Sequence, residues 1–583
     1  MKRILDLNGQ WRFIHEMEMR PTNNHNLTGG GIPVYAYPQL NRRDWQLVGV
    51  PDVWSNYGAR YEIYEGVCWY CRSFTVEGMT ERTKAQICFK GVTYRADVFV
   101  NGKPAGWHES SYTEFTLDVT GLIQEGENFI AVMVDNRPLI TKWPNDRGYF
   151  SYGGIHRDVF LELLDGTWLD RLEVTPELVD GTGEIEVRGV LNGKSGSVEV
   201  ALDGESRSVG VAPDEEGRFS FRVSYPGAAE WSPECPKLSR LTVSYDGETY
   251  FDHPVGFRSF KVKDGALALN SRPCRLNGCC YVYDSPRYGL VMTEEQLRYD
   301  LSEMKAAGVN AIRTHYPMDD KFYDMCDEMG FLVWIEPTVY CYKPSLDEKN
   351  TAFARQDSVD MAYSMAEEMI FAARRHPSVV IYGIGNECNV EHPEAIDFFR
   401  GLAKLVREKD GTRLVGFAAL YGLVGEIGEL LDVIGLNSYW GWYDKISDVT
   451  GYKPIEEKEG LVRPEPVDLT EFHRMVETSL KKLPERLPIL LTEFGADSIP
   501  GYHSSADDLW SEEYHAKVVK SMVEASRCHS RINGTFVFSF TDYTDPCKPF
   551  NGYWRGQNLK GMLSYQRDRK EPFYALREAY TKK

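Results

Sequence analysis

The stretch that decides the fold is Val379-Val-Ile-Tyr-Gly-Ile-Gly-Asn386-Glu387-Cys388, an apolar run that stops on a glutamate. A second run of this kind is Pro488-Ile-Leu-Leu-Leu-Thr-Glu493-Phe-Gly495. A glutamate at the end of a hydrophobic strand is poorly placed for packing. In a parallel α/β barrel it is well placed, because the carboxyl ends of the strands form the floor of the active site. Both runs therefore predict strands of such a barrel.

The two glutamates are interpreted as a pair. A single glutamate that ends a strand is more often a solvated boundary residue than a functional group. Here Asn386 directly precedes Glu387 and the pattern recurs at Glu493, which favours a functional pair. Two carboxyl groups in one site are typical of glycosidic bond cleavage, in which one is the acid/base and the other the nucleophile or base.

The region after residue 259 predicts a (β/α)8 TIM barrel. It contains eight apolar runs, and most are followed by helical patterns such as Met292–Met304, which Thr293 can cap, and Met318–Met329. A doubly wound open sheet is the alternative, but it would need a glycine-rich phosphate turn after its first strand, and the sequence has none. The predicted strands are Cys274–Cys280, Val309–Thr314, Phe331–Pro337, Val379–Glu387, Leu414–Ala419, Val433–Tyr439, Ile489–Phe494 and Thr535–Asp542.

The chain before the barrel shows no long helical period and predicts two all-β sandwich domains. Residues 1–164 contain short strands with turn signals, such as Ala96–Lys103, which alternates and then turns at Asn101-Gly102. This pattern is typical of a jelly-roll β-sandwich. Residues 165–258 predict a smaller immunoglobulin-like sandwich that acts as a spacer. Residues 259–583 are then the catalytic barrel.

Composition and charge limit the partners. The 583 residues are too many for one hydrophobic core, and the net charge of −20 opposes binding to nucleic acid or to anionic membranes. No apolar run is long enough for a transmembrane helix, and the residues after Met1 lack the apolar segment of a secretory signal. We expect neither a nucleic-acid nor a membrane partner.

The cysteines predict a reducing, cytoplasmic location. Several of the 12, such as Cys88, Cys326 and Cys388, lie in predicted strands or helices, where buried reduced thiols are usual. Cys68-Trp-Tyr-Cys71 has the spacing of a redox or metal motif, but residues three apart on a strand point to opposite faces. We therefore expect no metal site there. Cys279-Cys280 ends a predicted strand, so one of the two is a candidate pocket residue.

Polar side chains follow the ends of the predicted barrel strands. Because parallel strands of a barrel end on the same face, these side chains should form one convergent ring. The predicted members of the ring are Arg313, His315, Tyr316, Asn386, Glu387, Asn437, Tyr439, Tyr443, Glu493 and Asp542.

Motifs spread along nearly the whole chain carry a resemblance to a known family. They are Leu7-Asn-Gly-Gln-Trp-Arg-Phe13, Ala96-Asp-Val-Phe-Val-Asn-Gly102, Tyr152-Gly-Gly-Ile-His-Arg157 and Arg313-Thr-His-Tyr-Pro317. With them the chain resembles glycoside hydrolase family 2, which contains β-glucuronidases, β-galactosidases and β-mannosidases. The resemblance implies a sugar-binding-like jelly roll at the N-terminus.

Three barrel segments resemble the β-glucuronidase branch most. They are Asn437-Ser-Tyr-Trp-Gly-Trp-Tyr443, Thr492-Glu-Phe-Gly-Ala-Asp-Ser-Ile-Pro-Gly-Tyr-His-Ser504 and Asn558-Leu-Lys560-Gly561. The third resembles the Asn-x-Lys element with which β-glucuronidases hold the sugar carboxylate. Arg555, just upstream, would add a second cation to this carboxylate-binding group, which is called the carboxylate clamp below.

The resemblance implies a retaining mechanism, with Glu387 as acid/base and Glu493 as nucleophile. A nucleophile must stay ionised at neutral pH, and Arg313 and Tyr439 are the candidates that would stabilise its charge. The charge of Glu493 would in turn raise the pKa of Glu387 until the glycosyl-enzyme forms. The expected substrate contacts are Asn386, Tyr439, Tyr443, Arg313, His315, Asn558, Lys560, Arg555, Asp146 and Phe538.

Three departures from the β-glucuronidase pattern leave the sugar open. Tyr281-Val-Tyr-Asp284 stands where an Arg-His-Glu-Asp run is usual, and Phe538 replaces a tryptophan. In β-glucuronidases an aspartate of the sandwich domain contacts the sugar. Its position aligns with Gly148 in this chain, although Asp146 is close. These changes concern contacts to the ring hydroxyls, so bond cleavage is expected to be intact.

Several functions remain in competition. The leading prediction is an exo-acting retaining β-hexuronidase that cleaves β-glucuronides; the alternatives are a β-galacturonidase and a neutral-sugar β-galactosidase or β-mannosidase. A catalytically dead carbohydrate-binding protein would have no need for both glutamates with Asn386, Tyr439 and Arg313. No cofactor is expected, and a homodimer or homotetramer would suit the family. The segment Thr338–Gln356 is a candidate loop at the rim of the site.

Overall fold

The computed structural model describes most of the chain. The described residues are 2–15, 33–137, 143–144, 150–193, 195–443, 467–546, 548 and 556–582. The predicted contacts Asp146 and Arg555, and Gly148, lie outside them.

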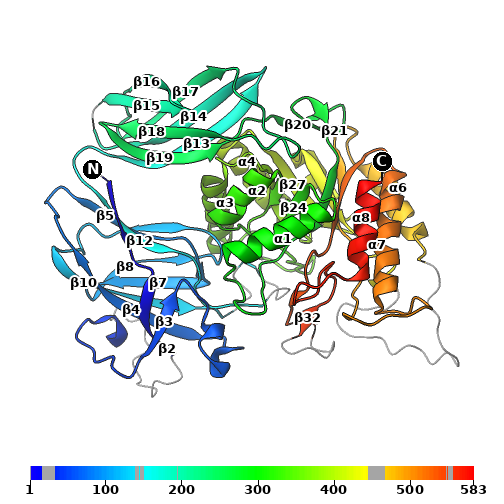
Figure 1. The fold of residues 1–583 in the computed structure, drawn as a ribbon, viewed down its shortest axis with the longest axis horizontal. Helices are drawn as coiled ribbons and strands as arrows, with labels where there is room; N and C mark the ends of the chain where they lie inside the picture. Colours follow the sequence, from blue (N-terminus) through cyan, green and yellow to red (C-terminus); the bar gives the residue numbers. More distant parts are fainter. Residues whose placement is uncertain are drawn as a thin grey trace.

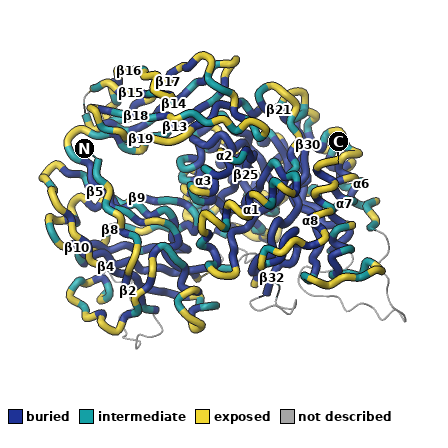
Figure 2. Tube along the Cα trace, in the orientation of Figure 1, coloured by how far each residue is buried: buried dark blue, intermediate teal, exposed yellow. Residues whose placement is uncertain are grey.

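Eight parallel strands close into a barrel, which confirms the predicted fold class (Figure 1). Strand and helix alternate along the chain, and the strands are the most completely buried part of the molecule (Figure 2). The strands are β23 (Leu276–Cys280), β24 (Ala311–Arg313), β25 (Leu332–Ile335), β26 (Val379–Asn386), β27 (Leu414–Leu420), β28 (Val433–Asn437), β29 (Ile489–Glu493) and β30 (Ile532–Val537).

The outer layer of the barrel consists of helices with one buried face. Thr293 caps α1 as predicted: its hydroxyl accepts from Gln296 N, and the Gln296 side chain accepts from the Thr293 N–H. Helix α2 stops at Gly330, whose φ of 75° suits glycine. The helices are α1 (Glu294–Ala306), α2 (Asp320–Met329), α3 (Gln356–Ala373), α4 (Ala395–Lys409), η6 (Gly425–Leu430), α6 (Thr470–Lys482), α7 (Glu512–Arg527) and α8 (Glu571–Thr581).

The eighth strand ends earlier than the sequence predicts. It stops at Val537, although Phe540 still contacts the neighbouring strand β23, and Asp542 bonds outside the barrel. Phe540 N donates to Cys280 O, and Asp542 N donates to Leu563 O. Asp542 therefore lies beyond the strand, beside the short pair β31 (Tyr543–Thr544) and β32 (Gln557–Asn558).

The N-terminal part is a sandwich of a four-stranded and a six-stranded sheet. Asn101 and Gly102 have φ values of 50° and 77°, so they form the predicted two-residue turn between β7 and β8. Cys68 and Cys71 on β4 lie in different apolar clusters, on opposite faces of the sheet. The strands are β1 (Lys2–Asp6), β2 (Gly9–His15), β3 (Gln46–Val50), β4 (Val67–Val76), β5 (Lys84–Phe89), β7 (Arg95–Val100), β8 (Lys103–Glu109), β9 (Phe115–Asp118), β10 (Gly126–Asp135) and β12 (Val159–Leu164), with the small pair β6 (Val92–Thr93) and β11 (Gly154–Ile155).

A second β-sandwich packs a three-stranded sheet against a four-stranded one. The predicted domain boundaries, after residues 164 and 258, stay predictions. The strands are β13 (Leu169–Val179), β14 (Thr182–Leu191), β15 (Gly196–Leu202), β16 (Glu205–Val211), β17 (Arg218–Pro226), β18 (Ser239–Tyr245) and β19 (Glu248–Val255), and a small sheet of β20 (Phe260–Lys263), β21 (Ala266–Leu269) and β22 (Arg272–Pro273) leads into the barrel.

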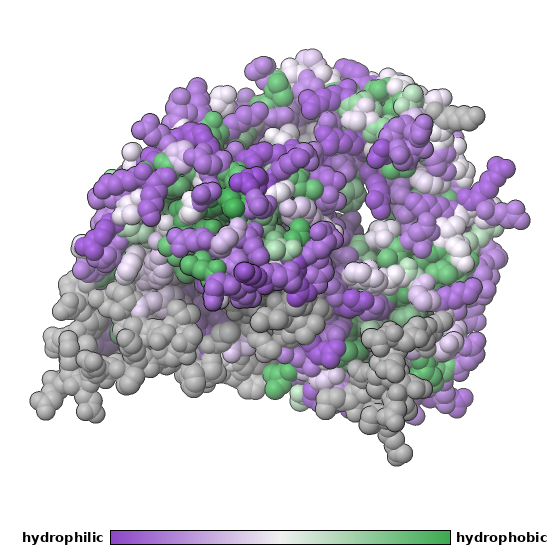
Figure 3. Space-filling model, turned by 180° about the vertical axis from the view of Figure 1, so that it is seen from behind, coloured by the Kyte–Doolittle hydropathy of each residue, from purple (hydrophilic) through white to green (hydrophobic). Residues whose placement is uncertain are grey.

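The surface is mainly hydrophilic. Seen from behind, hydrophobic residues form only small separate groups among the coloured atoms (Figure 3). Among the described residues, no helix is both long enough and apolar enough to cross a bilayer.

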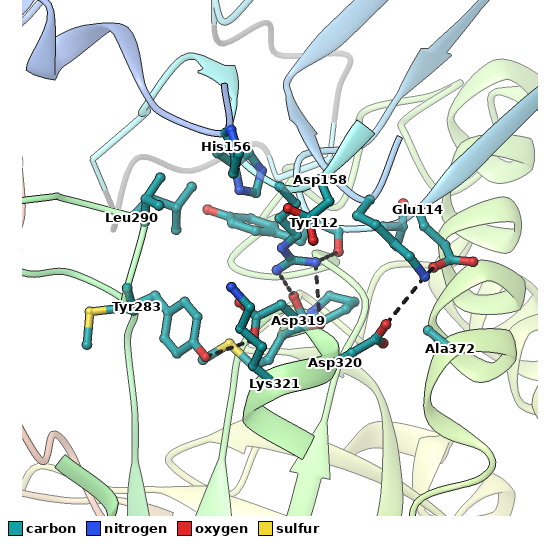
Figure 4. Close-up of a pocket in the computed structure, with 18 of the residues that line it drawn as sticks. Tyr112, Glu114, His156, Asp158, Tyr283, Leu290, Asp319, Asp320, Lys321 and Ala372 are labelled. Atoms are coloured by element: carbon teal, nitrogen blue, oxygen red, sulfur yellow. Dashed lines mark hydrogen bonds and ion pairs between the residues drawn. The ribbon is translucent and has the colours of Figure 1, made fainter. Parts of the chain in front are cut away.

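The N-terminal sandwich is fastened to the segment that follows β24. Arg157 Nη1 donates to Tyr112 O at 2.6 Å, and its Nη2 donates to Pro317 O at 2.9 Å. The Tyr112 ring stacks on Tyr316 with 4.0 Å between centroids. Figure 4 shows this interface, which encloses a cavity of about 100 Å³. Arg157 thus holds the chain next to His315 in place.

We predict that Arg157→Met lowers the melting temperature. The change leaves buried carbonyl oxygens without a donor, at a cost of roughly 1–3 kcal/mol. Thermal unfolding followed by circular dichroism measures the shift, and Arg298→Met, which removes an exposed ion pair on α1, is the control. Equal melting temperatures for the two variants would contradict the fastening role of Arg157.

Candidate active site

Arg313, the last residue of β24, is fully buried at the centre of the barrel mouth. Its Nη1 donates to Glu493 Oε1 at 2.8 Å, and its Nε and Nη2 donate to the two oxygens of Glu336 at 2.8 and 3.2 Å. Nη2 also donates to Asn386 Oδ1 at 2.9 Å. The planar fork of one guanidinium therefore fixes side chains at the ends of β25, β26 and β29.

Glu493 is a buried carboxylate surrounded by polar partners. Tyr439 OH donates to Glu493 Oε2 at 2.6 Å, and His315 Nε2 lies 2.9 Å from Glu493 Oε1. Burial alone raises the pKa of Glu493, but the contacts with His315, Arg313 and Tyr439 outweigh it and lower the pKa to about 2. Glu493 is thus ionised at neutral pH.

Glu387 follows β26 in the left-handed backbone region, with φ of 52°. Asn437 Nδ2 donates to Glu387 Oε1 at 2.9 Å, and Lys343 Nζ lies 3.6 Å from Glu387 Oε2. Burial and the charge of Glu493 raise the pKa of Glu387 to about 6, against the opposing charge of Lys343. The two glutamates therefore differ in protonation over a wide pH range.

The predicted ring assembles for most of its members. Phe538 packs edge-on against His315, with 5.7 Å between centroids, and Tyr443 packs on Tyr439 at 5.1 Å. The residues joined by direct hydrogen bonds are Arg313, His315, Asn386, Glu387, Asn437, Tyr439 and Glu493.

Three predicted ring members lie outside this hydrogen-bonded network: Tyr443 touches it only by packing on Tyr439, and Asp542 and Tyr316 have other partners. Asp542 instead accepts from Lys570 Nζ at 3.0 Å and from Gly561 N at 2.8 Å. The Tyr316 hydroxyl oxygen accepts from Tyr283 N at 2.9 Å, on the side of the N-terminal sandwich. Cys280 does reach the network: its Sγ lies 3.9 Å from Arg313 Nη1.

Lys560 and Asn558 belong to a buried cluster next to Tyr439. Lys560 is fully buried, forms an ion pair with Asp497, and lies 4.9 Å from the ring centroid of Tyr443. Asn558 Nδ2 lies 3.3 Å from Asp545 Oδ2, so Asn558 also faces an acidic side chain.

Lys548 is the more accessible cation of this cluster. Its Nζ lies 3.4 Å from Tyr443 OH and 4.0 Å from Asp497 Oδ2, and its side chain is 26% exposed, whereas that of Lys560 is 0% exposed. The charge of Asp497 keeps the pKa of Lys548 above its ordinary value despite burial. Two lysines and two aspartates thus meet beside the carboxylate pair.

Comparison with known protein families identifies the family to which the chain belongs. Residues 260–582 match the TIM barrel domain of glycosyl hydrolases family 2, and residues 55–164 match the sugar binding domain of the same family. The chain belongs to glycosyl hydrolase family 2. It is therefore a glycoside hydrolase, as the resemblance of its motifs implied.

Individual family-2 relatives cover almost the whole chain. The chain is 26% identical to a putative β-glucuronidase of Formosa agariphila over 93% of its length and 68% of that protein. It is 25% identical to the β-glucuronidase of Sus scrofa over 99% of its length and 90% of that protein. A solved β-galacturonidase from Eisenbergiella tayi, bound to galacturonate, is 27% identical with a TM-score of 0.83, covering 99% of this chain and 97% of that one.

Several residues of this family-2 site escape sequence reasoning. Glu336 follows the apolar run Phe331-Leu-Val-Trp-Ile, so the strand-end signal that found Glu387 could also have found it. Asp497, Lys343 and Lys548 lie on loops, where no periodic pattern marks a side chain that turns towards the site.

The family-2 barrel also contains a group of side chains with the spacing of metal ligands. Among the described residues these are Asp324, Asp327 and His376. Arg375 Nη1 already pairs with Asp324 Oδ1 at 2.9 Å, and His376 Nδ1 lies 2.7 Å from Asp327 Oδ2. The arginine opposes a metal ion, so we interpret the group as an ion-pair network near the start of β26, away from Glu387.

The position of Lys343 predicts the pH dependence. If Glu387 must be protonated, kcat/KM should fall as pH rises through the pKa of about 6 of Glu387. Lys343→Met should move this basic limb to higher pH, because the lysine charge lowers the pKa of Glu387. Lys349→Met, on the same loop, is the control. A limb at the same pH in both variants would contradict the contact.

Proposed function

We propose that this enzyme is a retaining exo-β-glycosidase that hydrolyses β-hexuronides, with β-D-glucuronides as the leading substrate class. The observation that carries the proposal is one hydrogen-bonded network containing two glutamates whose pKa values are pushed apart, Glu493 down and Glu387 up. A buried lysine and asparagine next to that network, Lys560 and Asn558, support the preference for a uronide.

In the first step, Glu493 Oε attacks the anomeric carbon while Glu387 donates its proton to the leaving glycosidic oxygen. A covalent glycosyl ester on Glu493 forms and the alcohol leaves. The ester carries no charge, so the pKa of Glu387 falls and its carboxylate can take a proton from water. That water attacks the anomeric carbon, which releases the sugar with retained configuration and restores both side chains.

The surrounding residues prepare these steps without reacting. Arg313 and Tyr439 place the two oxygens of Glu493 and stabilise its charge, and Asn437 orients Glu387. Phe538 and Tyr443 supply apolar walls. The contacts with individual sugar hydroxyls stay predictions.

The sugar carboxylate is proposed to bind at Lys548, Asn558 and Lys560. Lys548 is exposed enough to meet it directly, whereas Lys560 acts from beneath Tyr443. Asp497 balances one of the lysines, so selection depends on local hydrogen bonding rather than on a large excess of positive charge.

β-Galacturonide hydrolysis is the second candidate. The similarity to the galacturonate-bound enzyme over nearly the full length of both chains favours it. Tyr281 and Phe538, at positions where the β-glucuronidase pattern differs, are consistent with altered hydroxyl contacts. A cytoplasmic location and a homodimer or homotetramer stay predictions. The eleven cysteines in the described part of the chain form no disulfide with one another.

The two glutamates should respond differently to replacement. Glu493→Gln should abolish turnover, because the amide cannot form the ester. Glu387→Gln should lose roughly a hundredfold or more on poorly activated leaving groups and far less on 4-nitrophenyl or fluoride leaving groups, which need no proton. Steady-state kinetics with both substrate types tests this, and equal losses on both would contradict the role of Glu387.

The carboxylate clamp should discriminate uronides from neutral sugars. Lys548→Met should lower kcat/KM towards the better 4-nitrophenyl uronide by roughly ten- to a hundredfold and leave the matching neutral glycoside unchanged, since one charge-assisted contact is lost. Lys560→Met is combined with Asp497→Asn, so that no buried carboxylate is left unpaired.

The control for the clamp is Lys349→Met, which removes a lysine that has no contact with the cluster. Kinetics with glucuronide, galacturonide, galactoside and mannoside provide the comparison. A wild-type preference for the neutral glycoside, or an equal loss on both sugars, would replace the uronide proposal with the neutral-sugar one.

A further inference from the structure

A broad hollow lies on the N-terminal sandwich, beside β2, β4 and β10 and the segment 38–43. Its volume is about 910 Å³. Figure 1 places these strands in the blue part of the molecule, on the opposite side from α7 and α8. The hollow is built by residues other than those of the barrel site.

Four arginines line this hollow: Arg12, Arg42, Arg43 and Arg72. Glu127 is the one acidic side chain among its described lining residues. Within the described part of the chain none of the four arginines forms an ion pair with a carboxylate. In a chain with a net charge of −20, such a group of cations without a directly paired carboxylate is a local reversal of the overall charge.

Three of the four arginines, Arg12, Arg42 and Arg72, are held in place by backbone carbonyls, and some of their N–H donors remain unused. Arg12 uses only Nη1, for Arg42 O at 3.1 Å and Trp45 O at 3.4 Å. Arg72 uses only Nη1, for Leu7 O at 2.6 Å and Asn8 O at 2.7 Å. The Nε and Nη2 groups of Arg12 have no acceptor among the described residues. Together these two N–H groups can donate a pair of parallel hydrogen bonds to a carboxylate.

Arg42 adds a second sign of an absent partner. It is only 7% exposed and lies over the Phe129 ring at 4.5 Å, yet its Nε has no hydrogen-bond partner. A buried N–H group without an acceptor is uncommon, and an anion in the hollow would lie close to it. Since backbone carbonyls already fix Arg12, Arg42 and Arg72, little further ordering of these three side chains would accompany binding.

The lining favours an anionic ligand over a neutral sugar. The aromatic residues of the hollow, Trp11 and Phe129, are 0% and 8% exposed, so no open aromatic face is available for stacking. The accessible groups are instead guanidinium N–H donors, which bind carboxylates through paired hydrogen bonds.

We propose that this hollow binds the carboxylates of a uronate-containing saccharide chain, at a site separate from the barrel. The choice of a uronate rests on the proposed function. An acidic enzyme repels an acidic saccharide at long range, and the arginines would hold such a chain against the surface while its end is cleaved elsewhere.

The test is calorimetric binding of an oligogalacturonate to the full chain. Glu493→Gln provides a background in which the probe is not cleaved. On it, Arg12→Gln with Arg43→Gln should weaken binding roughly three- to tenfold at low salt, because one half-buried and one exposed cation are lost. Glu127→Gln should tighten binding, and Arg577→Gln on α8, which removes an equivalent exposed arginine elsewhere, should leave it unchanged.

The outcomes separate this site from the barrel. In the chain that keeps Glu493, hydrolysis of a small 4-nitrophenyl uronide should be the same with and without the arginine changes. Loss of oligogalacturonate binding in the arginine variant supports the hollow even if aryl uronides are not cleaved, in which case only the proposed function fails. Unchanged binding, equal binding of a neutral cello-oligosaccharide, or tighter binding of duplex DNA would overturn the proposal.

Discussion

The site depends on one buried guanidinium. Arg313 is fully buried, so its charge is stable only while carboxylates and carbonyl groups surround it. Glu336 takes two of its nitrogens and Glu493 takes the third. A substitution that removed either carboxylate would leave a buried charge without its partner, which costs several kcal/mol. The strand ends of the barrel are therefore locked to one another by charge as well as by packing.

This arrangement also gives the two glutamates different protonation states. Arg313 lies directly on Glu493 and favours its ionised form, whereas Glu387 receives an amide hydrogen bond from Asn437 and longer contacts from Lys343 and Cys341. With the charge of Glu493 close by, a further negative charge on Glu387 is unfavourable. Glu387 keeps its proton for that reason until the charge of Glu493 is lost in the covalent ester.

The sequence predicts the residues whose positions follow from strand periodicity. Arg313, Glu387 and Glu493 each stand at the end of an apolar run, and in a barrel all such ends meet. Asp542 was wrongly placed in this ring: apolar residues continue after β30, but the N–H of Asp542 already bonds outside the barrel, to Leu563 O. The pattern of hydrophobicity does not record where hydrogen bonding stops.

The carboxylate clamp shows that hydrophobic periodicity does not predict which side chains on loops become neighbours. Asn558 and Lys560 were found through a motif, but their partners Asp545 and Asp497 depend on how three loops pack together. Lys548 belongs to the same packing and has no motif of its own. Side-chain neighbours on loops are set by long-range contacts, so the sequence predicts the presence of cations there but not how their charges are balanced.

The central claim is that Glu493, held ionised by Arg313, forms the bond to the sugar. The most direct test is inactivation by a 2-deoxy-2-fluoro-β-uronosyl fluoride, followed by mass spectrometry of the labelled peptides. The claim predicts one fluorosugar ester, on Glu493, and no label in Glu493→Gln. A label on Glu387 or Glu336, or full hydrolysis of the β-linked substrate with an α-anomer as the first product, would contradict it.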